Sequence, residues 1–141
     1  MTRATEHARS VWRSIAAVFL GALAGAVLSL GTDQVLHVLR VYPPWWGQAM
    51  HQPSLNLLAL SYRLVFGVVG GWVIARLAPH APMGHALAGG ILGTVLSAAG
   101  AITAIKMDLG PAWYPIALAV TAVPCTWLGA VLQMRNARHE D

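Results

Sequence analysis

Four apolar stretches, each long enough to cross a lipid bilayer, dominate this chain of 141 residues. A membrane-spanning helix needs roughly 20 mostly apolar residues, and a backbone in hydrocarbon must satisfy its own hydrogen bonds, as a helix does. The connections between the stretches are short and carry helix breakers such as Pro43, Pro79 and Pro111. We therefore predict an all-α integral membrane four-helix bundle, one domain over residues 1–141, with spans at about 14–36, 57–77, 85–105 and 113–134.

The composition excludes several classes of protein. Charged residues make up 10% of the chain and hydrophobic residues 57%, whereas soluble domains carry about 25% charged residues. The net charge of +4 comes from thinly scattered basic residues, so we expect the lipid bilayer as a partner and no nucleic acid. Cys125 is the single cysteine, which excludes an internal disulfide.

The start of the chain shares two features with a secretory signal peptide. It is basic, and the sequence ALAGA offers a small-residue site of the cleavage type. However, the apolar run continues beyond the roughly 7–15 residues of a signal peptide. We therefore expect a retained membrane helix.

The distribution of Lys and Arg predicts how the chain lies in the membrane, because basic residues accumulate on the cytoplasmic side. With both termini in the cytoplasm, the basic residues outside the spans that face outward are Arg40 and Lys106. Those that face inward are Arg3, Arg9, Arg13, Arg76, Arg135 and Arg138. Aromatic residues mark membrane interfaces, and the predicted outer interface carries Tyr42, Trp45, Trp46, Trp113 and Tyr114. Both patterns predict cytoplasmic N- and C-termini.

Small residues recur every four positions in all four spans. Residues four apart lie on one face of a helix. Helices in lipid associate where small residues let their backbones approach. The repeat predicts a tightly packed bundle, with helix-packing glycines at Gly21, Gly25, Gly67, Gly71, Gly89, Gly93 and Gly129.

Arg63 lies inside the second apolar stretch, in the sequence SYRLVFGVVGGW, and its guanidinium stays charged. The small-residue face of the first span ends outward in Asp33 and His37. Because the two helices run antiparallel, Asp33 lies near the outer boundary and Arg63 about 9 Å below it, at roughly 1.5 Å per residue. We predict an ion pair between Asp33 and Arg63, with Tyr62, Gln34 and His37 nearby.

Two interpretations of this outer polar group remain open. Asp33 and Arg63 could hold two helices together, or Asp33, His37, Tyr62 and Arg63 could form a vestibule that receives a solute. Asp33 and His37 also have the spacing of two metal ligands, but further ligands would have to come from the first outer connection. His37 and His85, a pair that could hold a haem, fall at opposite ends of the bundle. We therefore predict no metal and no cofactor.

The first outer connection contains the sequence VYPPWWGQAMHQPSLN. Its paired prolines and tryptophans predict a semi-rigid segment at the outer interface. The segment is either an aromatic anchor or a lid over Asp33 and Arg63.

Three segments resemble a group of small hypothetical four-helix bacterial membrane proteins. They are LGTDQVLHVLRVYPPW, SYRLVFGVVGGWVIARLAPHAPMGHALAGGILG and AWYPIALAVTAVPCTWLG, which cover most of the chain outside its two tails. The resemblance implies a multi-pass protein of the bacterial inner membrane. It implies no activity and no functional residues.

The sequence carries no nucleophile elbow, no His-Glu-x-x-His motif and no phosphate-binding loop, so we predict no enzyme. We expect a helix-packing accessory or structural subunit that associates with itself or with another membrane protein. The alternative is a small oligomeric channel or transporter with Asp33, His37 and Arg63 lining an outer vestibule. We favour the subunit because no polar path crosses the predicted membrane centre, where Ser97 and Thr121 stand among small apolar residues.

Overall fold

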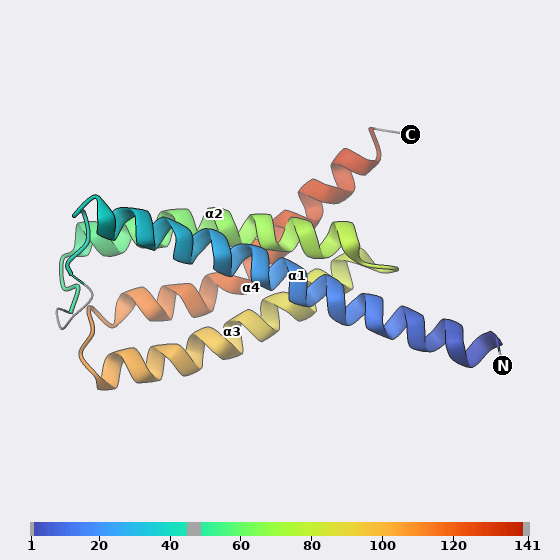
Figure 1. The fold of residues 1–141 in the computed structure, drawn as a ribbon, viewed down its shortest axis with the longest axis horizontal. Coiled ribbons are helices and arrows are strands. Elements are labelled where there is room, and N and C mark those ends of the chain that lie inside the picture. Colours follow the sequence, from blue (N-terminus) through green and yellow to red (C-terminus); the bar gives the residue numbers. More distant parts are fainter. Residues whose placement is uncertain (1, 45–48, 140–141) are drawn as a thin grey trace.

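The computed structural model describes residues 2–44 and 49–139 of the chain. It contains four helices, α1 at Thr2–Val38, α2 at Pro53–Leu77, α3 at Pro82–Lys106 and α4 at Trp113–Ala137 (Figure 1). The described ranges contain no strand, and each helix includes a segment long and apolar enough to cross a membrane. The prediction of an all-α fold with four apolar helices is therefore confirmed. Trp45 and Trp46 lie outside the described residues.

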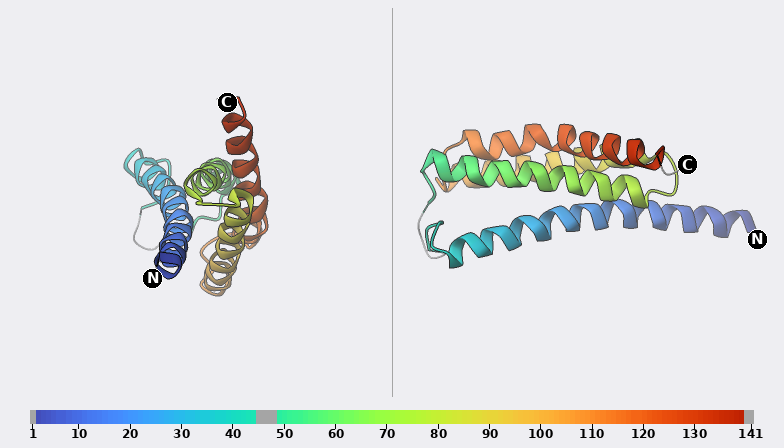
Figure 2. Two further views of the ribbon diagram at one scale, coloured as in Figure 1. Left: turned by 90° about the vertical axis from the view of Figure 1, so that its right-hand side faces the viewer. Right: turned by 90° about the horizontal axis from the view of Figure 1, so that it is seen from above.

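Successive helices run antiparallel, so the connections gather at two ends of the bundle (Figure 1). The α1–α2 and α3–α4 connections form what we call the loop end. Both chain termini and the α2–α3 connection form the terminal end. α2 lies between α1 and α4, and α3 packs against α4 and α2 (Figure 2). Within the described ranges α1 and α4 make no close backbone approach, and α1 approaches α3 over fewer residues than it approaches α2. One side of the bundle is therefore less closely packed, between α1 and the α3–α4 pair (Figure 2).

Each predicted span lies inside one helix, but α1 begins well before its predicted span. It has 37 residues, which corresponds to about 55 Å at 1.5 Å per residue, against a hydrocarbon core of about 30 Å. Its N-terminal part projects beyond the bundle at the terminal end (Figure 1). Residues 2–13 contain neither Gly nor Pro and include the helix formers Ala, Arg and Glu, so nothing in this segment ends the helix.

The interior of the bundle is built from small side chains. Ile74 is the one large side chain that is fully buried in the described part of the protein. The large apolar side chains point outward, as Leu30 and Val120 do with exposed fractions of 66% and 68%. This distribution is typical of helices that pack in lipid, because burying a large apolar side chain there gains little over leaving it among acyl chains. The buried alanines include Ala17, Ala59, Ala75, Ala86 and Ala130.

Glycine allows the backbones of α2 and α4 to touch. A Cβ atom on Gly71 would collide with the backbone of Thr126, and one on Gly129 would collide with the backbones of Val68 and Trp72. No side chain can move aside to relieve such a contact, so the close crossing requires glycine at both positions. The other predicted packing glycines also face a neighbouring helix; they are Gly21, Gly25, Gly67, Gly89 and Gly93.

At the loop end the two connections contact each other. The backbone N–H of Met50 donates to the carbonyl of Leu109 at 2.9 Å. His51 Nε2 lies 3.2 Å from Asp108 Oδ1. The side-chain amide of Asn56, which is buried, donates to the carbonyl of Met50 at 2.8 Å. These contacts hold the two connections together at the loop end of the bundle.

Candidate functional site at the loop end

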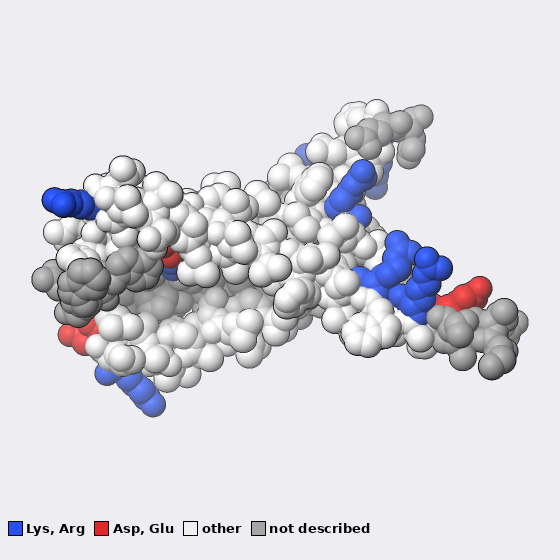
Figure 3. Space-filling model, viewed as in Figure 1, with Lys and Arg blue, Asp and Glu red and all other residues white. Residues whose placement is uncertain are grey.

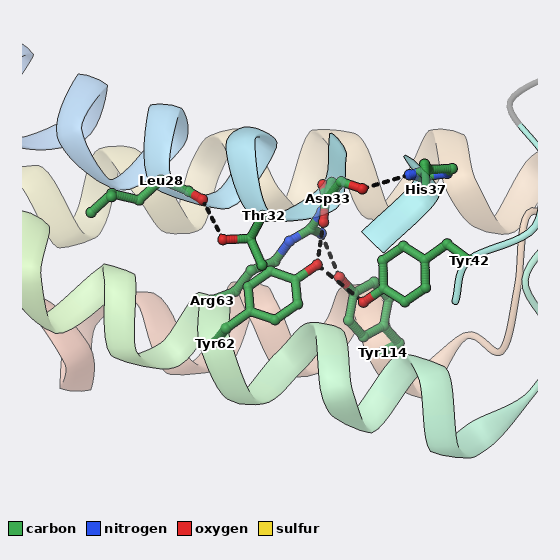
Figure 4. Close-up of polar contacts among 8 residues, drawn as sticks. All are labelled: Leu28, Thr32, Asp33, His37, Tyr42, Tyr62, Arg63 and Tyr114. Atoms are coloured by element: carbon green, nitrogen blue, oxygen red, sulfur yellow. Dashed lines mark hydrogen bonds and ion pairs between the residues drawn. The ribbon is translucent and has the colours of Figure 1, made fainter. Parts of the chain in front are cut away.

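Asp33 of α1 and Arg63 of α2 meet in the loop-end half of the bundle (Figure 4). Arg63 Nη2 donates to Asp33 Oδ2 at 2.5 Å. The Asp33 side chain is 13% exposed and the Arg63 side chain 28%. Water therefore screens the pair only partly, and the attraction between the two charges is stronger than in an ion pair at a protein surface.

Two tyrosines extend the contact from Asp33. The Tyr62 hydroxyl donates to Asp33 Oδ1, because an ionised carboxylate can only accept. The Tyr42 hydroxyl lies 3.1 Å from that of Tyr62. Since Tyr62 uses its single proton toward Asp33, Tyr42 is the donor to Tyr62. Both carboxylate oxygens of Asp33 are thus used within the protein, and the α1–α2 connection is tied to the site through Tyr42.

Arg63 also reaches α4. Its Nη1 donates to the hydroxyl of Tyr114, and its guanidinium carbon lies 5.8 Å from the centre of the Tyr114 ring. Arg63 Nε is buried and has no hydrogen-bond partner within the described part of the chain. One arginine therefore connects α1, α2 and α4, with one of its buried N–H groups unsatisfied by those residues.

His37 lies one helical turn beyond Asp33. Its Nδ1 is 2.7 Å from the backbone carbonyl of Asp33, so Nδ1 carries the proton of this hydrogen bond. The ring of His37 also packs edge-on against Tyr42, with centroids 5.4 Å apart. Burial at this position raises the pKa of the Tyr42 hydroxyl above its usual value. The two aromatic rings hold the connection that follows α1 close to the ion pair.

Two cavities adjoin Arg63. The first, of about 290 Å³, opens toward the loop end and is lined by Asp33, His37, Tyr114 and the connection residues Pro43 and Met50 among others. Residues of both connections therefore line the cavity beside the ion pair. Arg63 also lines this cavity.

The second cavity lies deeper, toward the terminal end, and has a volume of about 450 Å³. Its polar lining comes from Ser29, Arg63, Ser97, Thr121 and Cys125. Thr121 turns its hydroxyl to the carbonyl of Ala117 at 2.6 Å. Arg63 is the one residue that lines both cavities, the first at the loop end and the second near the middle of the helices.

The structure brings together Asp33, Tyr62 and Arg63, and it places His37 beside them. Gln34, which we expected nearby, is exposed. The contacts that link Tyr114 and Tyr42 to this cluster were not predicted from the sequence. A signal was present, since a guanidinium has five N–H donors and one carboxylate cannot satisfy them all.

The arrangement can hold three helices and one connection together, and it presents a guanidinium to two cavities. No group of three or more His, Cys, Asp or Glu side chains within the described ranges lies close enough to hold a metal ion. His51 pairs with Asp108 instead of joining Asp33 and His37. No protein-family model, curated protein or solved structure matches this chain.

Proposed function

We propose that this protein is a non-catalytic, multi-pass subunit of the bacterial inner membrane, which packs against itself or against another membrane protein. The observation that carries the proposal is the pairing of Asp33 with Arg63. The two charges neutralise each other, and Tyr62 and Tyr114 take up further hydrogen bonds of both groups. A site built in this way stabilises contacts between helices and keeps little free charge for a substrate.

The distribution of charge supports an orientation with both termini in the cytoplasm. Basic side chains are concentrated at the terminal end (Figure 3), where Arg9, Arg13, Arg76, Arg135 and Arg138 occur. The loop end carries Arg40 and Lys106. By the positive-inside rule the terminal end faces the cytoplasm. The bacterial assignment rests on the resemblance of the chain to small bacterial membrane proteins.

Cysteine labelling in intact cells tests the orientation. In a Cys125→Ala background, we introduce Ala49→Cys in the first connection and Asn136→Cys near the end of α4, both at exposed positions. A membrane-impermeant maleimide should label Ala49→Cys in intact cells and Asn136→Cys only after lysis. The reverse pattern would refute the proposed orientation.

Purification in mild detergent tests the subunit role. We expect the protein, after chemical cross-linking in its native membrane, to migrate as a defined complex containing either several copies or a second protein in fixed ratio. A species whose detergent-corrected mass equals one chain of 15.0 kDa, both with and without cross-linking, would contradict the proposal.

A second function, a small channel or transporter, is favoured by one observation. Arg63 lines both cavities, and its buried Nε lacks a partner within the described residues. A polar solute passing from the first cavity to the second would meet this guanidinium. The small hydroxyl groups of Ser97 and Thr121 would line its path through the middle of the membrane.

Liposomes distinguish the two functions. If the protein conducts solutes, Ser97→Cys in the Cys125→Ala background should react with a water-soluble thiol reagent, and the reaction should block flux. If the protein is a subunit without a pore, the reagent should leave Ser97→Cys unmodified. Val95→Cys, which lies on the exposed side of the same helix, is the matched control for reactivity from the lipid phase.

A further inference from the structure

An apolar groove runs between α1 and α3 on the less closely packed side of the bundle. It has a volume of about 810 Å³. The walls are formed by side chains such as Val18, Phe19 and Leu23 of α1 and by Leu92 and Leu96 of α3. Its two polar lining residues, Ser14 and His85, both lie at the terminal end of the groove. The groove is therefore apolar along its length, and the two lining residues that carry polar groups lie at its terminal end.

Basic side chains lie near the terminal end of the groove. Arg9 and Arg13 of α1 line a small pocket together with His80 of the α2–α3 connection. Glu6 is the one acidic residue in the same pocket. The rings of His80 and His85 are in edge contact at 5.1 Å, so the pocket and the groove adjoin each other. The terminal end of the groove thus carries a net positive charge.

The length of the groove matches one leaflet of a bilayer. Its lining extends from Ser14 to Ala26 along α1 and from His85 to Leu96 along α3. At 1.5 Å per residue these segments span roughly 16–18 Å, and half of the hydrocarbon core is roughly 15 Å. A molecule with a polar head at the membrane surface and an acyl chain reaching the bilayer centre would fill it.

We propose that the α1–α3 groove binds an anionic phospholipid, with one acyl chain between the helices and the phosphate beside Arg9, Arg13 and His80. Charge complementarity selects the headgroup, since basic side chains near a membrane surface attract anionic lipids. The apolar walls of the groove favour the acyl chain of the lipid. The site is distinct from the Asp33–Arg63 cluster, which lies at the opposite end of the bundle.

Native mass spectrometry after incubation with equal amounts of phosphatidylglycerol and phosphatidylcholine, which carry the same acyl chains, tests the headgroup. Wild-type protein should retain the anionic lipid about fivefold or more over the neutral one. Arg9→Gln/Arg13→Gln should remove most of this preference. Arg135→Gln/Arg138→Gln removes the same amount of charge at the terminal end of the bundle, but from α4, and should preserve the preference for the anionic lipid. Equal losses in both double variants would overturn the specific site in favour of diffuse attraction.

Binding of the acyl chain is tested separately, by filling the groove with a larger side chain. Ala88→Phe adds a ring at an exposed groove position of α3, and Ala98→Phe adds one at an exposed position of α3 that does not line the groove. We expect Ala88→Phe to lower retention of the anionic lipid severalfold and Ala98→Phe to leave it unchanged. If Ala88→Phe instead dissociates an oligomer while lipid retention stays constant, a second copy occupies the groove and the proposal is wrong. Circular dichroism checks that each variant is folded.

Discussion

Arg63 Nη2 lies 2.5 Å from Asp33 Oδ2, although the two residues belong to different helices and are separated by 30 positions in the chain. The contact joins α1 to α2, and the second Nη group of Arg63 joins α2 to α4 through Tyr114. α1 and α4 make no close backbone approach of their own within the described ranges. The arginine therefore connects two helices that are otherwise held only through their shared neighbours.

Removing one partner of the ion pair should be more damaging than removing both. Asp33→Asn leaves the Arg63 guanidinium without its counter-charge in a poorly hydrated site. We expect a loss of about 2 kcal/mol in unfolding free energy, below the roughly 3–5 kcal/mol for a fully buried pair, because the Arg63 side chain is 28% exposed. Asp33→Asn/Arg63→Gln should lose less. Unfolding by a denaturing detergent provides the measurement.

A charge-swapped protein, Asp33→Arg/Arg63→Asp, provides a further check on this pair. Its unfolding free energy should exceed that of Asp33→Arg alone, because the swap restores opposite charges. If the swapped protein is no more stable than either single variant, the two side chains do not interact.

Two tyrosines of the cluster, Tyr62 and Tyr42, should differ in their contributions. Tyr62→Phe removes a hydrogen bond to a carboxylate, which contributes roughly 1.5–3 kcal/mol, whereas Tyr42→Phe removes one between neutral hydroxyls, which contributes roughly 0.5–1.5 kcal/mol. Tyr62→Phe should therefore lower the unfolding midpoint more than Tyr42→Phe. Thermal unfolding of both variants in one detergent measures the order. A larger effect of Tyr42→Phe would show that the donor assignment between the hydroxyls is wrong.

Glycine-to-alanine variants should separate glycines at helix crossings from glycines that face open space. Gly129→Ala would force α2 and α4 apart, since its Cβ would meet the backbones of Val68 and Trp72. We expect a cost of about 1–3 kcal/mol in unfolding free energy. Gly100→Ala on α3 has nothing within 4 Å of its new Cβ and should be neutral or stabilise by up to about 1 kcal/mol through helix propensity. Equal effects at both sites would refute the backbone contact.

Alkaline pH should remove the stabilisation that Tyr42 supplies. Burial raises the pKa of its hydroxyl in the folded protein, so the folded state keeps this proton where the unfolded state, with a pKa of about 10, loses it. The contribution is complete below about pH 10 and is lost as the pH rises toward the folded-state pKa. The midpoint difference between wild type and Tyr42→Phe should therefore be smaller at about pH 11 than at about pH 8, where the contribution is still complete. A constant difference would contradict the burial of this hydroxyl.

The sequence predicted the Asp33–Arg63 contact but not its full set of partners. Depth along antiparallel helices follows from the residue count, so the charged groups of α1 and α2 could be placed at similar heights. Which side of each helix faces which neighbour depends on all helix contacts at once. Tyr114, at the start of α4, therefore could not be assigned to Arg63 until the rotation of α4 was known.

The lengths and composition of the four apolar stretches determined the helical fold by themselves, because each helix satisfies its backbone hydrogen bonds within its own segment. The N-terminal limit of the apolar stretch did not determine where α1 starts. The helix begins earlier, at Thr2, because the residues before the stretch favour helix. Only the tertiary structure decided that α2 lies between α1 and α4 and that one side of the bundle is less closely packed. All four spans carry small residues that permit close packing, so the choice among their pairings depends on how whole surfaces fit together.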